Sequence, residues 1–393
     1  MRDIFLKEVW KPYPKVFTKN EEFIFGRVKS VGQENVVLIC DSKEIEVVGS
    51  VEGNSDVHFG KSIPKSFLEN GDVVAFDKVK RNFYLLSPNL SGCNIKVDDR
   101  FLCWSGFLDE VEKYFLNEAF FKARTPFLVE SPGVDHHIDF LKVEGCKTKR
   151  VWSLPTSPEI HLKKLLCSGF EKVFEIKSCF RDDLCGPHHN VEFTMLEWYR
   201  SFVTLDDLVK DLENLIGKVS QKKLKISKVF LSDRFFETTG FKLSPHTTLS
   251  ELKECASVHA IEFQEDDDWN DVFFRIYMEK VEQTLGRERP EVVFNFPPQQ
   301  ASLAQLNDEG WAERFELYWN GVELANAYCE VNDPWENKRR FEGEQELRKK
   351  AQKEISSFDE DFFMKLKDGM PPSCGIAMGL DRLYMLIRGD NAI

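Results

Sequence analysis

The stretch FEIKSCFRDDLCGPHHNVEFTMLEWYR, residues 174–200, is the most informative part of the chain. Its runs Val173 to Arg181 and Val191 to Arg200 flank a loop rich in Asp, Gly, Pro and His, which predicts an antiparallel hairpin. Residues two apart share a face of a strand. One predicted face holds Phe193, Met195, Glu197 and Tyr199, and the facing set on the first strand is Glu175, Lys177, Cys179 and Arg181. If the register agrees, both sets enter one pocket.

The side chains on this shared face suit two kinds of ligand. Arg181 offers a fixed fork of donors for phosphate, and Phe193 offers a flat surface for a base. Glu197 and Tyr199 can hold an ammonium group. The pattern therefore predicts a nucleotide beside a cationic substrate, while an Arg–Glu pair with aromatic packing inside a sheet fits it equally well.

From about residue 93 onward, the chain alternates between helical and strand-like patterns. An apolar stripe from Phe101 to Phe115 predicts a helix that ends near Thr125-Pro126. Further helices are predicted at His161–Leu166, Leu205–Val219 and Trp335–Ser357. In the last helix, Glu336, Glu344 and Glu346 precede Arg340, Arg348 and Lys350 by four residues, which predicts three ion pairs. Strands are predicted at Val292–Phe296, Arg314–Trp319 and Val322–Val331, before a final segment Gly375–Ile387. These patterns indicate an α+β domain with an antiparallel sheet flanked by helices.

The first ninety or so residues have short alternating segments instead, which predicts a small all-β domain. Its strands are expected at Glu22–Val28, Asn35–Ile39, Glu44–Val48, Val73–Val79 and Arg81–Leu86. An oligonucleotide-binding (OB) barrel and other small barrels fit equally well. With a linker at Ser87–Gly92, the expected domains are residues 1–92 and 93–393. Residues 221–290 look like an insertion of mixed helices, and its acidic cluster Glu265 to Asp268 is expected to be a solvated turn.

Composition limits the possible partners and surroundings of the chain. Its 393 residues are 42% hydrophobic and 30% charged, with a formal net charge of −13, which argues against broad affinity for phosphate backbones. No apolar run approaches the length of a membrane span, and no signal segment is visible, so a cytoplasmic protein is expected. The 10 Cys form no C-x-x-C pair and are expected to be reduced thiols.

Three segments resemble the signature motifs of class II aminoacyl-tRNA synthetases, in family order. Phe180-Arg181-Asp182-Asp183, followed by His189 and Phe193, resembles the second motif, and Gly375 to Leu383 resembles the third. Thr125-Pro126, after a long helix, resembles the first motif, which lies at a dimer interface in the family. The resemblance implies the class II fold, ATP as a substrate and a homodimer.

Within that class, the chain is similar to lysyl-tRNA synthetases and their paralogues, the elongation factor P lysyltransferases. The run His189 to Tyr199 resembles both groups, whereas Ser157-Pro158-Glu159 and Met195 to Tyr199 together resemble the paralogues. The tRNA-charging enzymes usually carry Gly in place of Ala377, and a methyl group in a tight pocket changes substrate preference by about 1 to 3 kcal/mol. Neutral drift at Ala377 is the open alternative. Asp183 departs from the family's usual Glu, and Asp333-Pro334 looks closer to the tRNA-charging enzymes.

The resemblance implies a site residue by residue. The expected ATP-binding residues are Arg181, Asp183, His189, Asn190, Phe193, Glu323, Leu324, Gly379 and Arg382, with Arg181 and Arg382 as the catalytic pair. The expected substrate-binding residues are Ser157, Glu159, Glu197, Tyr199, Asn326, Glu330 and Ala377. Glu323 and Glu330 are expected to bind Mg²⁺. Their odd separation predicts a bulge or break near Asn326 that brings both carboxylates to the site.

Three functions follow from these expectations. The leading hypothesis is ATP-dependent activation of lysine or (R)-β-lysine and transfer to a lysine side chain of elongation factor P. The first alternative is a lysyl-tRNA synthetase that charges tRNA-Lys. The second is a non-catalytic, synthetase-like protein that binds a translation component, although Arg181, Glu323, Glu330 and Arg382 together speak against it. Aromatic and basic residues gathered on one face of the N-terminal domain would favour an RNA partner.

Overall fold

A computed structural model describes residues 23–32, 35–40, 43–47, 68, 72–78, 82–87, 99–133 and 135–390. The chain forms two compact units, residues 1–103 and 104–393. Within the described residues, no helix is long and apolar enough to cross a membrane.

The N-terminal unit contains a five-stranded antiparallel sheet, which confirms the all-β prediction. Its strands are β1 (Phe23–Val31), β2 (Val36–Cys40), β3 (Lys43–Val47), β4 (Val73–Asp77) and β5 (Asn82–Ser87), in the order β3-β2-β1-β4-β5. Val28, Leu38, Val74 and Phe83 are among the buried residues of its core. This arrangement is OB-like. The predicted strand ends Glu22, Val48, Val79 and Arg81, and residues 88–92 of the predicted linker, lie outside the described residues.

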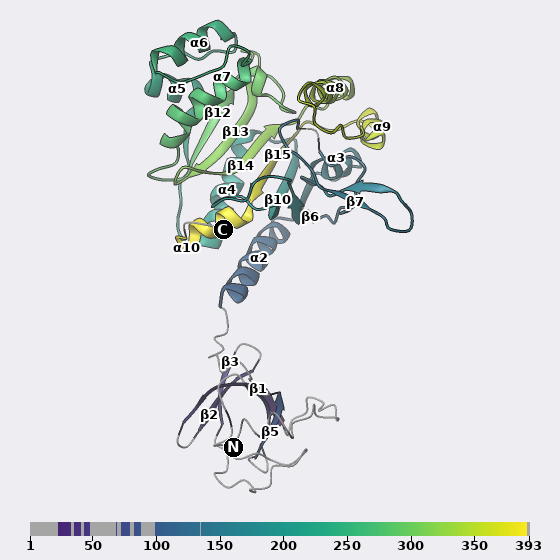
Figure 1. Cartoon of the computed structure of the whole chain (residues 1–393), viewed down its shortest axis with the longest axis vertical. Helices are drawn as coiled ribbons and strands as arrows, with labels where there is room; N and C mark the ends of the chain where they lie inside the picture. The colour runs from purple at the N-terminus through teal and green to yellow at the C-terminus, as the bar shows by residue number, and fades with distance from the viewer. Residues whose placement is uncertain are drawn as a thin grey trace. The chain divides into compact units, whose positions relative to one another are not determined.

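The C-terminal unit is built on an eight-stranded sheet (Figure 1) in the order β11-β12-β13-β14-β15-β10-β9-β6. Its strands are β6 (Phe121–Lys122), β9 (Lys172–Phe180), β10 (Glu192–Ser201), β11 (Ser227–Phe230), β12 (Glu291–Phe296), β13 (Ala312–Trp319), β14 (Val322–Cys329) and β15 (Ser373–Gly379). The central pairs are antiparallel, as predicted, and only the two edge strands pair in parallel with their neighbours. A separate two-stranded sheet, β7 (Lys142–Glu144) and β8 (Val151–Ser153), was not predicted.

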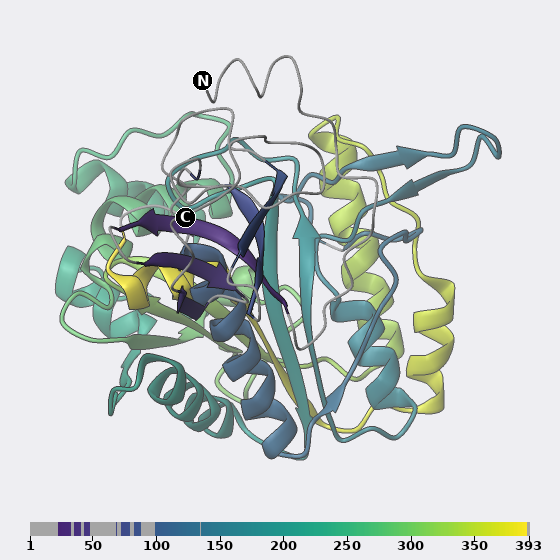
Figure 2. The same ribbon diagram turned by 90° about the horizontal axis from the view of Figure 1, so that it is seen from below.

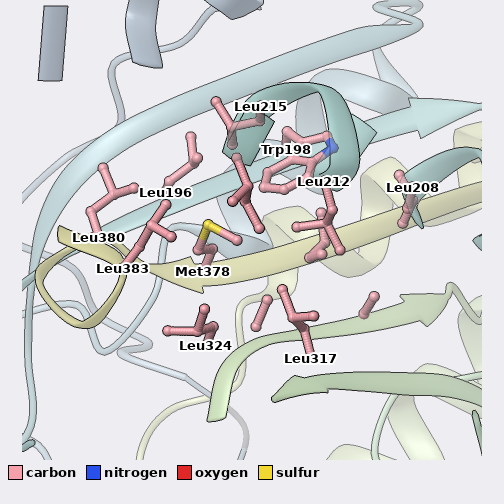
Figure 3. Packing of buried hydrophobic residues seen from close by; sticks show 14 of the residues in the cluster. Leu196, Trp198, Leu208, Leu212, Leu215, Leu317, Leu324, Met378, Leu380 and Leu383 are labelled. Atoms are coloured by element: carbon pink, nitrogen blue, oxygen red, sulfur yellow. The ribbon is translucent and has the colours of Figure 1, made fainter. Parts of the chain in front are cut away.

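One face of the large sheet is sealed by three helices: α2 (Asp99–Asn117), α4 (Leu205–Ser220) and α10 (Leu380–Arg388). Figure 3 shows Leu212 and Leu215 of α4 and Leu383 of α10 packed with Leu196, Trp198 and Met378 of the sheet. Because strand residues alternate between faces, the odd-numbered residues of β10 and β15 point to the opposite face. That opposite face holds the candidate site.

The region predicted as an insertion carries its own core at one end of the sheet (Figure 1). It contains α5 (Leu231–Thr239), α6 (Leu249–Val258), α7 (Trp269–Ile276) and short helical turns at Tyr277–Val281 and Glu282–Thr284. The prediction of helices alone was wrong, because β11 joins the large sheet in parallel with β12. The acidic cluster is a turn as predicted: Asp267 accepts from the Gln264 backbone at 2.9 Å, and Asp268 caps α7.

Several helix ends differ from the prediction. The first helix ends at Asn117 instead of near Pro126, because Ala119 has a left-handed φ of 60° and Phe121–Lys122 joins the sheet. The charged helix α8 (Pro334–Lys350) ends before Ser357, and a second helix, α9 (Glu360–Asp368), lies beside it (Figure 2). Helix α3 (Glu159–Cys167) and helix α4 lie where helices were predicted.

The predicted ion pairs of α8 are only partly correct. Glu336 pairs with Arg340 at 2.8 Å as expected. Glu344 instead contacts His136 at 2.6 Å, and Glu346 pairs with Lys349. Arg348 turns inward and donates to the Ile138 carbonyl at 2.8 Å, because the loop before β7 packs against this side of α8.

Candidate active site

The open face of the large sheet carries a cavity of about 350 Å³. All the predicted site residues except Glu330 line it. They come from the start of α3 and the loop before it, the β9–β10 hairpin, β14, β15 and the start of α10. The set is Ser157, Glu159, Arg181, Asp183, His189, Asn190, Phe193, Glu197, Tyr199, Glu323, Leu324, Asn326, Ala377, Gly379 and Arg382. Leu324 borders the cavity although its side chain belongs to the core (Figure 3), so we expect it to act through its backbone.

The hairpin has the register that a shared pocket requires. Phe193 lies opposite Cys179 and Glu197 lies opposite Glu175, so the predicted faces of the two strands coincide. The Arg181 guanidinium lies over the Phe193 ring, 5.2 Å from its centroid. The buried Nε of Arg181 has no hydrogen-bond partner among the described residues. Arg181 therefore keeps a donor available for an anionic ligand beside a flat ring.

Arg382 also lines this part of the cavity. Its guanidinium donates to the Glu323 carbonyl at 2.8 Å and the His188 carbonyl at 3.1 Å, and it lies 2.9 Å from His189 Nε2. Burial and the neighbouring Arg382 charge lower the pKa of His189, which favours a neutral ring whose Nε2 accepts this hydrogen bond. Arg382 thus ties α10 to both β14 and the hairpin loop.

The other end of the cavity is acidic and buried. Glu197 is 1% exposed, and it accepts hydrogen bonds from Ser157 Oγ at 2.5 Å and from Tyr199 at 3.1 Å. Burial, followed by the charge of Glu159, raises the pKa of Glu197 to about 8. A cation entering this end would find a carboxylate already held in place.

Glycine and alanine on β15 leave room for these groups. Ala377 lies directly opposite Glu197 in the sheet, and Gly375 lies opposite Tyr199. A Cβ atom at Gly375 would overlap the Tyr199 ring and lie 2.7 Å from Glu330 Oε1. The third-motif segment thus shapes the acidic end as well as the nucleotide end.

The predicted bulge in β14 is present, two residues earlier than expected. Tyr318 pairs with Glu323 but Leu317 pairs with Ala325, so Leu324 is the extra residue. After this bulge, Glu323 and Asn326 share the open face despite their odd separation. The strand geometry therefore brings Glu323 to the cavity.

Glu330 is placed differently from the other predicted residues. It lies under the cavity wall at 1% exposure, and its nearest cation is Lys163 at 2.6 Å. The carboxylate whose charge acts most strongly on Glu323 is Glu316: burial, then Glu316, raises the pKa of Glu323 to about 7. Glu316 is itself paired with Arg314 and does not line the cavity, so Glu323 is the carboxylate of these two that a divalent cation in the cavity could reach.

Two residues that act on the carboxylates of the site were missed by the sequence-based prediction. Lys163 follows Glu159 by one helical turn, and that spacing was a usable signal. Glu316 lies between Arg314 and Tyr318 on alternate positions of β13, so a polar face in a strand of the sheet interior could have revealed it.

Comparisons with known proteins agree with this geometry. The family described as tRNA synthetases class II (D, K and N) matches residues 87–393. The elongation factor P (R)-beta-lysine ligase of Haemophilus influenzae is 36% identical over 285 residues, which cover 70% of this chain and 87% of the relative. The Haemophilus ducreyi ligase is 35% identical over 296 residues, covering 74% and 90%. A protein of Aquifex aeolicus named as a homolog of this ligase is 35% identical over 292 residues, covering 74% and 96%. The chain therefore belongs to the class II aminoacyl-tRNA synthetase family.

Proposed function

We propose that this chain activates lysine or (R)-β-lysine with ATP and transfers the activated group to a lysine side chain of elongation factor P. The observation that carries the proposal is the cavity itself, in which Arg181 and Phe193 stand at one end and Glu197 and Tyr199 at the other. Relatives that match most of the chain are elongation factor P (R)-beta-lysine ligases, which supports the acceptor.

At the nucleotide end, Phe193 stacks on the adenine, and Arg181 and Arg382 face the phosphates. Arginine suits this role because its planar fork binds two oxygen atoms at once. Arg181 follows the end of β9 and Arg382 lies in the first turn of α10, so two separate elements supply the two guanidinium groups. Catalysis then rests on positioning and on charge stabilisation.

At the amino-acid end, Glu197 and Tyr199 hold the distal ammonium of the substrate. Ser157 keeps the Glu197 carboxylate oriented through its 2.5 Å hydrogen bond. Glu159 also lines this end and offers a second carboxylate for the other amino group. The substrate carboxylate then points toward Arg181 and the α-phosphate.

Mg²⁺ would be held by the Glu323 carboxylate, because Glu323 lines the cavity whereas Glu330 is buried and paired with Lys163. Glu316 also does not line the cavity: it is paired with Arg314 and accepts a hydrogen bond from Tyr318 at 2.8 Å. When bound, Mg²⁺ would neutralise charge on the phosphate oxygens. Glu330 is paired with Lys163 beside the amino-acid end and does not line the cavity.

The reaction has two balanced steps. A substrate carboxylate oxygen bonds to the α-phosphorus of ATP, and the bond to the β-phosphate oxygen breaks, which gives an aminoacyl-adenylate and pyrophosphate. The acceptor amine then bonds to the carbonyl carbon, releases AMP and loses one proton. Arg181 stabilises the charge that develops on the α-phosphate in the first step.

A tRNA acceptor is the second candidate, and the OB-like sheet of the N-terminal unit favours it, because such sheets commonly bind oligonucleotides. Ala377 favours the protein acceptor instead, because the tRNA-charging enzymes usually carry Gly at this position, and its methyl group lies opposite Glu197, where the amino acid would bind.

The experiment offers ATP, Mg²⁺ and labelled lysine or (R)-β-lysine to the purified chain, with elongation factor P and total tRNA in separate reactions. We expect label on a lysine of elongation factor P, located by peptide mass spectrometry. Label on tRNA alone would replace the proposal with the second candidate.

A further inference from the structure

Lys163 is a buried cation that has no role in the proposed reaction so far. It lies on α3 and its side chain is 1% exposed. Its Nζ is 2.6 Å from Glu159 Oε1 and 2.6 Å from Glu330 Oε2. Burial lowers the pKa of Lys163, but the two carboxylates more than offset this, so its pKa is raised and the side chain is an ammonium.

The two partners of Lys163 differ in their exposure. Glu159 lines the cavity and is 26% exposed, whereas Glu330 is 1% exposed, does not line the cavity and lies close to Gly375. Lys163 therefore joins a carboxylate that ligands can reach to one that they cannot.

Three carboxylates gather at this end of the cavity. Burial raises the pKa of Glu197 and that of Glu330, the charge of Glu159 raises both further, and the charge of Lys163 lowers both. Burial, followed by the charges of all three carboxylates, raises the pKa of Tyr199, which packs against Gly375. Without the Lys163 cation, Glu197 and Glu330 would repel the Glu159 carboxylate. The Glu159 side chain would then turn toward solvent.

Stability alone gives little reason for a lysine at this position. An apolar side chain of similar length usually replaces a buried ion pair with little loss of stability, because desolvation offsets the attraction. The same helix offers a comparison: Lys164, half-buried at 18% exposure, pairs with Asp359 and Asp361 at 2.9 Å each, away from the cavity lining. The contacts of Lys163 with both Glu159 and Glu330 are therefore better explained by a role in arranging the site than by a contribution to stability.

We propose that Lys163 is a positioning residue for the amino-acid substrate: it lies between Glu159 and Glu330 and keeps the Glu159 carboxylate aimed into the cavity. This inference rests on the proposed function, because it assumes that Glu159 receives an ammonium group of the substrate. Lys163 balances the charge of Glu330, which leaves Glu159 and Glu197, once Glu197 ionises as the substrate binds, for the two ammonium groups of a lysine-type substrate. Lys163 does not contact the nucleotide end.

The test measures two dissociation constants, for (R)-β-lysine or lysine and for ATP, in the full chain and in K163M. Methionine keeps the length of the buried side chain and removes its charge. We expect amino-acid affinity to fall by about tenfold or more, since truncating one partner of a buried charge pair is strongly unfavourable. ATP affinity should stay unchanged. K164M, the same substitution one residue away, should leave both constants at the wild-type values.

A double-mutant cycle with E330Q separates positioning from general damage. E330Q removes one of the like charges that Lys163 offsets, so adding K163M to E330Q should reduce amino-acid affinity by much less than K163M does alone. If K163M does not fold, the comparison of E330Q with K163M/E330Q carries the test by itself, with a small difference expected.

Three results overturn the inference. They are wild-type amino-acid affinity in K163M, equal losses of amino-acid and ATP affinity in a folded K163M, and a full tenfold loss when K163M is added to E330Q. If the wild-type chain binds neither amino acid, the proposed function fails and this inference fails with it. Wild-type binding combined with any of the three results rejects Lys163 alone.

Discussion

At the nucleotide end of the cavity, cationic side chains are held by rings and carbonyl groups and keep donors free, whereas at the amino-acid end the anionic side chains already have partners. Arg181 lies over Phe193 with an unpartnered buried Nε. Glu197 is held by Ser157 and Tyr199 instead. The arginine side chains of the nucleotide end can therefore bind the negatively charged phosphates of ATP. The carboxyl groups of the amino-acid end lie close together and need the positive charge of an ammonium group to be stable as carboxylates.

Substitution of Arg181 should break the nucleotide end and have the largest effect. In R181M we expect adenylate formation to fall by about a thousandfold, because a preorganised charge at the reacting phosphate is lost. Pre-steady-state release of pyrophosphate measures this step. R388M is the matched control, since Arg388 pairs with Asp390 near the end of α10 and does not line the cavity. Equal rates in R181M and R388M would contradict the assignment.

Substitution of Glu197 should break the amino-acid end and leave the nucleotide end intact. In E197Q we expect the affinity for lysine-type substrates to fall by about a hundredfold, because a buried ammonium loses its charged partner. ATP affinity should stay at the wild-type value, and isothermal titration with each ligand separates the two. A parallel loss of ATP affinity would show that the ends are not independent.

The sequence predicted some of the residues that form the two ends of the cavity, but not all of them. Arg181, Phe193 and Glu197 were predictable because a strand period of two and one hairpin put them on one face. The need for a bulge in β14 also followed from that period, although its position at Leu324 did not. The fold class followed from the same alternation of strands and helices.

The rest depended on contacts between distant segments. Glu330 and Lys163 lie far apart in the chain, and no local pattern shows that they meet under the cavity wall. The parallel pairing of β11 with β12 was missed for the same reason, because it joins segments separated by three helices. The ends of α2 and α8 were misjudged because the apolar or charged pattern continues past the last hydrogen-bonded turn.

A smaller change should strain the amino-acid end without altering its charge. In G375A the new methyl group would overlap the Tyr199 ring, so we expect a loss of about 1 to 3 kcal/mol of stability together with weaker amino-acid binding. Thermal unfolding and titration measure the two effects. G343A is the control, because a Cβ at Gly343 in α8 meets nothing within 4 Å and should leave binding unchanged. Wild-type stability in G375A would contradict the close packing.

A change of pH should affect the amino-acid end more than the nucleotide end, and this is the smallest of the expected effects. Burial raises the pKa of Glu197 from its ordinary value of 4.5 to about 8. The folded chain thus retains a proton that the unfolded chain has released, so the stability contributed by this group decreases as pH rises from 4.5 through 8. Ammonium binding needs the carboxylate, so amino-acid affinity should increase over the same interval, by about fivefold between pH 7 and pH 8, where the ionised fraction of this group rises most in absolute terms.

Titrations at several pH values check this dependence, with E197Q as the control that should lose it. Binding of the amino acid that weakens toward pH 8 in the wild-type chain would mean that Glu197 does not receive the ammonium group.

The most direct test of the paired ends is amino-acid-dependent exchange of labelled pyrophosphate into ATP. The account predicts exchange with lysine or (R)-β-lysine, and little exchange with norleucine, which lacks the distal ammonium, or with no amino acid. Exchange with norleucine at the rate seen for the diamino acids would contradict it, because the acidic end would then play no part in selecting the substrate.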